Sequence, residues 1–292
     1  LAGGAPGQVA HFRGMAGESR EDFQPEIWLT GIRREETELR KSLDVVSLDG
    51  RGIVINIMNR SLEVQELALV IAVKQQDPSL LTPDFLRYSG IVPQEWELSR
   101  QPVRAQQVAQ VSYQNGVSIL AYPDRTVLVE SLSDKDSETV EIPAIAQRYS
   151  EVLRNMDYQA VGVNFRGYVS FSGEGAHDYV CKTLLSPGSW QQVGTQPMRA
   201  GLNLVYTFER NQLNLSVQEA MLQLPEQERL PVVLFTGNFE SQLKGATEAE
   251  RLVQVQQALE GWRSDLATYQ QVVGQFLDAE ATTLIPMPAM PV

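Results

Sequence analysis

The chain has 292 residues and a formal net charge of −12, and it is 43% hydrophobic and 21% charged. This composition is typical of a globular protein with a sizeable core, built as one large domain or two smaller ones. The excess of acidic residues repels phosphate backbones at long range, which argues against nucleic-acid binding as the general function.

The chain is poor in the residues that make disulfides and metal sites. Cys181 is the only cysteine, and His11 and His177 are the only histidines. No intrachain disulfide can form, and zinc sites built on thiolate and imidazole lack ligands, so we expect no metal and no cofactor. The single cysteine fits a reducing compartment, and we expect a soluble, cytoplasmic protein.

No apolar run approaches the roughly 18 residues of a transmembrane helix. The longest, "LALVIAV", is far too short, so we expect no transmembrane segment. The Gly/Ala-rich start lacks the charged stretch and apolar run of a signal peptide. We interpret residues 1–42 as a flexible N-terminal arm with a short charged helix.

Residues 43–157 predict a first half rich in strands. "DVVSL" and "GIVINIMN" flank an Asp-Gly turn signal. The run "EVQELALVIAVK" predicts a central strand covered on both faces, because its second half is apolar at both parities. "PSLLTPDFLRYSG" predicts a short helix that ends at Gly90.

The strongest local pattern follows, in "QQVAQVSYQNGVSILAYPDRTVLVESL". The turn signals Asn115-Gly116 and Pro123-Asp124 divide it into three strands, which predicts an antiparallel meander. Residues 141–156 predict the next helix. Its apolar stripe consists of Ile145, Tyr149, Val152, Leu153 and Met156.

Residues 158–280 predict a second half with the same order of elements. "YQAVGVNFRGYVSF" is its opening strand, and "GAHDYVCKTLL" is a short helix. Three strands follow, "GLNLVYTFE", "QLNLSVQ" and "LPVVLFTGNF", and a long helix starts near Ala246. We therefore predict an α+β fold with a mostly antiparallel sheet and helices on one face, built from two similar β-α-β-β-β-α halves. Two separate subdomains with a boundary near Asp157 are the alternative.

The last helix carries an unbroken apolar seam with alternating spacings of three and four residues. The seam consists of Leu252, Val255, Leu259, Trp262, Leu266, Tyr269, Val273 and Phe276. One interpretation is an oligomer interface. The other, which the bulky Trp and Tyr favour, is a helix packed along its own sheet. The tail at 281–292 is rich in proline and cannot continue the helix.

Motifs for catalysis are weak throughout. No phosphate-binding loop occurs, and "GEGAH" is only a loose glycine pattern. His177 and Cys181 lie four residues apart and meet on one helix face, but a single cysteine is more often a small buried hydrophobe than a nucleophile. Nothing in the sequence selects a catalytic pair among the 36 acidic residues, so we assign no catalytic residue.

A surface is the remaining candidate site. Successive side chains of a strand point to opposite faces of the sheet. If the apolar residues of each alternating strand face the helices, the residues between them form a polar sheet face that also includes Gln110, Ser112, Thr207 and Ser216. The candidate interaction residues are Asn164, Arg166, Tyr168, Asn203 and Asn214. Arg and Tyr are favoured anchors at protein interfaces. The alternative is a plain solvated sheet face.

The stretch "YSEVLRNMDYQAVGVNFRGYV", which follows "NGVSILAYPDRTVLVES", resembles a family of uncharacterised, cyanobacterial-type proteins over about the middle third of the chain. The shared element is a strand that leads into Arg-Tyr or Arg-x-Tyr, here Arg166-Gly167-Tyr168. The resemblance implies the meander, helix and strand, and it carries no activity.

These patterns favour a non-enzymatic interaction or assembly protein. We expect a protein partner or self-association through the open polar sheet face, with the last helix as a second candidate surface. The alternative is an enzyme or small-molecule-binding protein with a cleft between the two halves.

Overall fold

The computed structural model describes residues 60–133, 135–173, 175–223 and 229–283. All of them belong to one compact unit. The predicted N-terminal arm, the two strands predicted between residues 44 and 59, and the tail from residue 284 onward lie outside the described residues.

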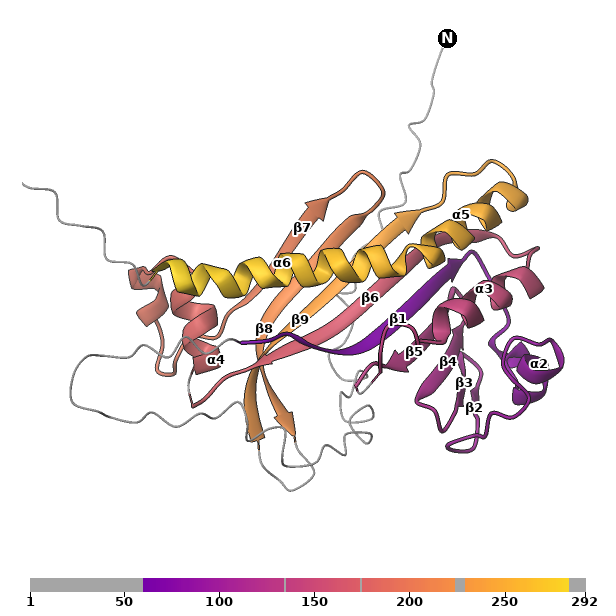
Figure 1. The fold of residues 1–292 in the computed structure, drawn as a ribbon, viewed down its shortest axis with the longest axis horizontal. Coiled ribbons are helices and arrows are strands. Elements are labelled where there is room, and N and C mark those ends of the chain that lie inside the picture. Colours follow the sequence, from indigo (N-terminus) through magenta and orange to yellow (C-terminus); the bar gives the residue numbers. More distant parts are fainter. Residues whose placement is uncertain (1–59, 134, 174, 224–228, 284–292) are drawn as a thin grey trace, which may run out of the picture. The chain divides into compact units, whose positions relative to one another are not determined.

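The core of the described fold is one antiparallel sheet of nine strands (Figure 1). Its strands follow the order β2-β3-β4-β5-β1-β6-β9-β8-β7. They are β1 (Glu63–Val73), β2 (Val103–Ala105), β3 (Val108–Ser112), β4 (Val117–Tyr122), β5 (Arg125–Ser131), β6 (Tyr158–Ser170), β7 (Gly201–Thr207), β8 (Gln212–Gln223) and β9 (Arg229–Gln242). The predicted antiparallel sheet of an α+β fold is confirmed.

The predicted meander is β3-β4-β5, with its turns at the predicted positions. Gly116 adopts φ +85°, a conformation that glycine tolerates far better than other residues, and it joins β3 to β4. The predicted central strand is β1, which lies between β5 and β6. Its residues Leu67, Leu69, Ile71 and Val73 are buried, whereas the alternate residues from Ala68 to Ala72 are only partly buried.

The helices are shorter or more broken than the sequence pattern predicts. They are α2 (Pro83–Tyr88), α3 (Ile142–Val152), α4 (Gly175–Asp178), α5 (Glu248–Glu260) and α6 (Trp262–Thr283), with the short 3₁₀-helices η3 (Pro78–Leu80) and η5 (Ser189–Gln192) and the π-helix η4 (Tyr179–Thr183). The helix predicted over 141–156 stops at Val152, and the Val152 side chain is exposed rather than part of the apolar stripe.

A buried carboxylate fixes the start of α3. Glu130 at the end of β5 is fully buried and accepts hydrogen bonds from the backbone N–H groups of Glu141 and Ile142, at 2.8 and 2.9 Å. Lys135 pairs with the same carboxylate at 2.6 Å. Because free N–H groups at a helix start favour negative charge, Glu130 both caps α3 and ties it to the sheet.

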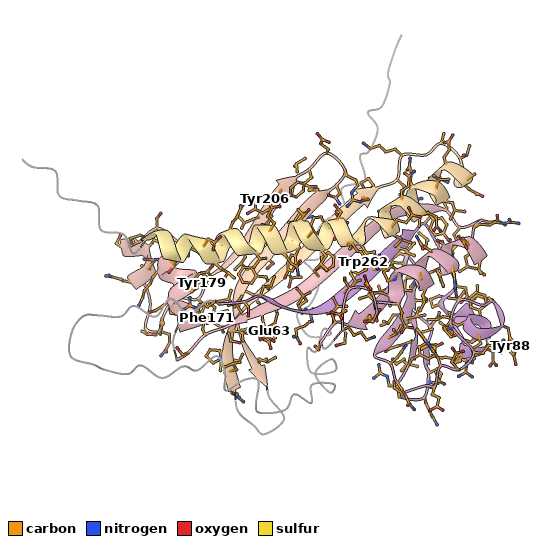
Figure 2. All side chains as sticks on the ribbon, in the orientation of Figure 1. Glu63, Tyr88, Phe171, Tyr179, Tyr206 and Trp262 are labelled. Carbon is orange, nitrogen blue, oxygen red and sulfur yellow. The ribbon has the colours of Figure 1, made fainter. Side chains whose placement is uncertain are left out.

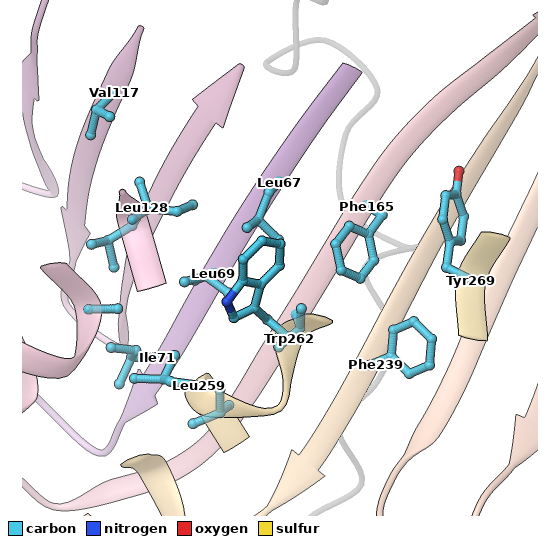
Figure 3. Packing of buried hydrophobic residues seen from close by; sticks show 14 of the residues in the cluster. Leu67, Leu69, Ile71, Val117, Leu128, Phe165, Phe239, Leu259, Trp262 and Tyr269 are labelled. Carbon is cyan, nitrogen blue, oxygen red and sulfur yellow. The ribbon is translucent and has the colours of Figure 1, made fainter. Parts of the chain in front are cut away.

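Helices α5 and α6 lie along the sheet on the same side as α3 (Figure 1). The Tyr269 ring of α6 stacks on Phe165 of β6 at 5.5 Å, and its hydroxyl donates to the backbone oxygen of Phe235 at 2.9 Å. Figure 3 shows Phe165, Phe239 and Tyr269 together in this layer. A Cβ at Gly237 would lie 2.7 Å from the Tyr269 ring, so this glycine makes room for it.

The second helix contact lies at the C-terminal end of α6. Tyr179 of η4 donates to the backbone oxygen of Phe276 at 2.9 Å, and its ring lies 5.1 Å from that of Phe171 (Figure 2). The short helical segment from α4 to η4 therefore anchors the end of the long helix to the end of β6.

Candidate interaction face

Three asparagines form a row across neighbouring strands. Asn164 of β6 pairs directly with Asn238 of β9, and Asn238 pairs with Asn214 of β8. Directly paired residues of an antiparallel sheet point to the same side. Since the alternate residue Phe165 faces α6, this asparagine row lies on the side of the sheet turned away from the helices.

A second row runs parallel to the first, two residues further along β6. Arg166 pairs with Thr236 of β9, which connects through Ser216 of β8 to Asn203 of β7. Tyr168 lies on the same side, one row beyond. The structure thus brings together all five residues that the sequence selected. We call this set, with Asn238, the polar face.

Acidic residues of β1 border the polar face. Glu66 pairs directly with Arg166 across the strands, and its Oε1 lies 4.0 Å from Arg166 Nη1. Burial raises the pKa of Glu66, and the Arg166 guanidinium only partly offsets that effect. Tyr168 donates its hydroxyl hydrogen to Glu63 Oε2 at 2.9 Å.

Part of the hydrogen-bonding capacity of this face is unused. Asn164 donates from Nδ2 to the backbone oxygen of Ala68 at 3.2 Å. Within the described part of the chain, Asn238 Oδ1 and Arg166 Nε are buried and have no hydrogen-bond partner. A buried polar atom left without a partner costs about 1–3 kcal/mol, so both groups lower the stability of the fold, and an outside partner reaches them only when the surrounding side chains move.

The same side of the sheet is apolar over the first half. Leu120 of β4, with Val127 and Val129 of β5, occupies the positions that correspond to the polar rows. Ser112 and Ser118 are buried there and bond to each other at 2.9 Å. Gln110 and Ser112 are therefore separated from the asparagine row, and the polar face is confined to β6, β9, β8 and β7.

The sequence interpretation missed Asn238 and the two bordering acids. Asn238 shares its parity with Thr236 and Glu240 in β9, so alternation along that strand was the available signal. Glu63 and Glu66 were not identifiable, because their place beside β6 depends on a strand pairing with about a hundred residues between the partners.

The seam of the last helix is used within the chain itself. Val255, Leu259, Trp262, Tyr269 and Val273 are at most 2% exposed, and Leu252, Leu266 and Phe276 pack against the same cluster. The helix therefore lies along its own sheet, as one of the two interpretations predicted. Five of the eight seam side chains are therefore core residues of the single chain, and Leu252, Leu266 and Phe276 are partly buried beside them.

The His177 imidazole contacts both Glu219 and Cys181. His177 Nδ1 lies 3.0 Å from Glu219 Oε2 and 3.8 Å from Cys181 Sγ, so the nearer acid engages this nitrogen. Arg199 also pairs with Glu219. Burial raises the pKa of Cys181, and the Glu219 carboxylate raises it further, so the thiol stays protonated at neutral pH.

Among the described residues, no three histidine, cysteine or acidic side chains gather in a way that would hold a metal ion. In the same part of the chain, no helix combines the length and apolar character needed to cross a bilayer. Comparison of the whole chain with protein-family models and with curated proteins gave no match.

Proposed function

We propose that this chain is a non-enzymatic interaction protein that binds a partner polypeptide on its polar face. The observation that carries the proposal is the row of Asn164, Asn238 and Asn214 beside Arg166, whose half-buried side chains lie on one side of three adjacent strands. Amides and a guanidinium supply both donors and acceptors, which suits a partner that presents backbone N–H and C=O groups.

The dimensions of the face support a polypeptide rather than a small ion. Neighbouring strands lie about 4.8 Å apart, so the row from Asn164 to Asn214 spans about 10 Å and the row from Arg166 to Asn203 about 14 Å. Such a span matches several residues of an extended chain. The bordering acids Glu63 and Glu66 and the net charge of −12 disfavour a phosphate-rich partner.

The proposal also assigns roles within the face. Arg166 is a residue type that often anchors interfaces, because it combines a large contact area with directed hydrogen bonds. Tyr168 is buried and donates to Glu63, so its role is to support the face. The asparagines provide adaptable hydrogen bonds around Arg166. Glu66 keeps the Arg166 side chain oriented, since the two side chains face each other across β1 and β6.

Peptide selection on the immobilised protein tests the proposal. Peptides selected from a random display library should bind the double variant Arg166→Ala/Asn214→Ala at least tenfold more weakly than wild type, a loss of about 1.4 kcal/mol. Gln110→Ala is the matched control, because Gln110 lies on the same side of the sheet but in the first half. Selected peptides that bind the double variant and wild type equally would overturn the proposal, provided that circular dichroism shows both proteins folded.

We propose further that the sheet consists of two related β-α-β-β-β-α halves, and that the protein acts in the cytoplasm. The order β3-β4-β5-β1 in the first half is mirrored by β7-β8-β9-β6 in the second half, which supports the proposal that the two halves are related. The scarcity of cysteine supports the proposal that the protein acts in the cytoplasm. In this view the second half specialised in binding, since only its outer side is rich in asparagine.

A further inference from the structure

The two edges of the sheet differ in length and exposure. At one edge β2 has only three residues, whereas β7 at the other edge has seven. Natural proteins protect sheet edges with short strands, charged side chains, proline or bulges, because an open edge invites another strand to pair. The edge at β2 is protected by the shortness of its strand.

Strand β7 carries none of these protections. Its sequence, "GLNLVYT", contains no charged residue and no proline. Its pairing with β8 runs from Gly201 to Thr207 without a register shift, so no bulge bends it away. The Val205 side chain is 59% exposed. An exposed, regular and uncharged edge of this length is suited to pairing with another strand.

The backbone groups available for that pairing follow from the hairpin. Phe208 donates its N–H to the backbone oxygen of Asn211 at 2.9 Å, which directs the groups of residue 208 toward β8. Hydrogen-bonding direction alternates along an antiparallel strand. The outward-directed groups are therefore those of Gly201, Asn203, Val205 and Thr207.

We infer that β7 pairs antiparallel with β7 of a second copy of this chain, about a two-fold axis at Leu204. This register pairs Asn203 with Val205 and Gly201 with Thr207 of the partner copy, so all outward backbone groups are matched. Leu204 meets its own equivalent on the helix side, where it is only partly buried in the single chain. The inference rests on the sheet edge and is independent of the proposed function of the polar face.

Charge complementarity selects this register and this partner. Arg199 and Glu209 lie five residues before and five residues after Leu204, and both are exposed. Antiparallel pairing at Leu204 places Arg199, two residues before β7 of one copy, near the end of β7 of the other copy, which Glu209 follows by two residues. Arg199 also pairs with Glu219 in its own chain, and the several donors of a guanidinium can serve two carboxylates. A register centred on Val205 would instead place Glu209 opposite Gly201.

Sedimentation of the full chain with a matched pair of variants tests the inference. The wild-type chain of 32.5 kDa should form a concentration-dependent dimer. Val205→Lys should raise the dimer dissociation constant at least tenfold, because the two ammonium groups would lie at diagonal positions on the same side of the paired strands, within reach of each other. Val253→Lys should leave it unchanged, since Val253 is similarly exposed, at 56%, but lies on α5. A wild-type monomer at all concentrations, or equal dimerisation of Val205→Lys and wild type, would overturn the inference.

Glu209→Arg tests the register without altering the strand. It should weaken the dimer, because it places like charges near each other at both ends of the paired strands, and high salt should reduce the difference. An unchanged dissociation constant for Glu209→Arg would overturn the register centred on Leu204. Circular dichroism of each variant separates lost pairing from lost folding.

Discussion

Successive residues of β6 serve opposite sides of the sheet. Phe165 and Gly167 face the helices. Phe165 stacks on the Tyr269 ring, and Gly167 leaves space beside the Tyr269 hydroxyl. Arg166 and Tyr168 face the other way and contact the acids of β1. The glycine between Arg166 and Tyr168 therefore has a packing role on the helix side, and it does not interrupt the polar face.

Glu66 makes a pH-dependent contribution to folding. Its folded-state pKa lies above the ordinary value of 4.5, with burial as the main cause and Arg166 opposing it. Between the two values the folded protein binds more protons than the unfolded one, so this contribution favours folding most at low pH and is lost as pH rises through the folded-state pKa. Glu66→Gln should remove this dependence and should be at least as stable as wild type at pH 7.

Urea unfolding at a series of pH values from 4 to 8 measures this effect, with the exposed Glu95→Gln as the control. If Glu66→Gln is less stable than wild type at pH 7, the ion pair with Arg166 contributes more than burial costs.

At the scale of elements, local chemistry was sufficient for much of the prediction. The Asn115-Gly116 turn, the Pro123-Asp124 turn and the alternation along β6 specify strands within short windows of sequence, and all three predictions are confirmed. Helix ends were harder to predict. The stop of α3 at Val152 and the break at Gly261 between α5 and α6 depend on contacts made by the rest of the chain.

The break at Gly261 illustrates such a contact. Arg210, from the turn between β7 and β8, donates to the backbone oxygen of Gly261 at 3.3 Å and also pairs with the buried Asp265. A Cβ at position 261 would collide with the Arg210 guanidinium. The sequence shows a glycine within an apolar seam, and only the fold shows which side chain occupies the space beside it.

Two glycines of similar sequence context should respond in opposite ways to substitution. Gly237→Ala should lower the free energy of unfolding by about 1–3 kcal/mol, because its Cβ would lie 2.7 Å from the Tyr269 ring within a packed layer. Gly274→Ala in α6 should raise it by up to about 1 kcal/mol, because nothing lies within 4 Å of its Cβ and alanine favours the helix.

Urea denaturation of the two variants and wild type gives both differences directly. Equal stability of Gly237→Ala and wild type would mean that α6 shifts freely on the sheet, in conflict with the close packing of Tyr269. A loss of stability in Gly274→Ala would point to a contact of α6 that the structure does not contain.

At the scale of the whole described fold, pairing between distant strands was beyond sequence reasoning. Strand β1 pairs with β6 of the second half as well as with β5 of its own half, and β9 pairs with both β6 and β8. These pairings compete with many others of similar alternation, and the choice depends on how all strands pack together. The composition of the polar face was therefore predictable from parity, whereas its border with β1 was not.

The two halves should unfold together. The ladder from β1 to β6 makes one continuous sheet, and Leu259 and Trp262 of the last helices belong to the same buried cluster as Leu67 and Ile71 of β1 (Figure 3). Gln256 of α5 donates to Ser150 of α3 at 2.7 Å. Because separating the halves would expose this cluster, we expect a single cooperative transition rather than the stepwise loss of residues 43–157 and 158–280.

Hydrogen exchange followed by mass spectrometry across a urea series tests this expectation with β4 and β8 as reporters, one from each half. Both should lose protection at the same urea concentration and with the same dependence on urea, since both then report global unfolding. Distinct midpoints would show that the boundary near Asp157 separates two independently stable units. In that case the shared layer of α5 and α6 would contribute less to stability than its burial indicates.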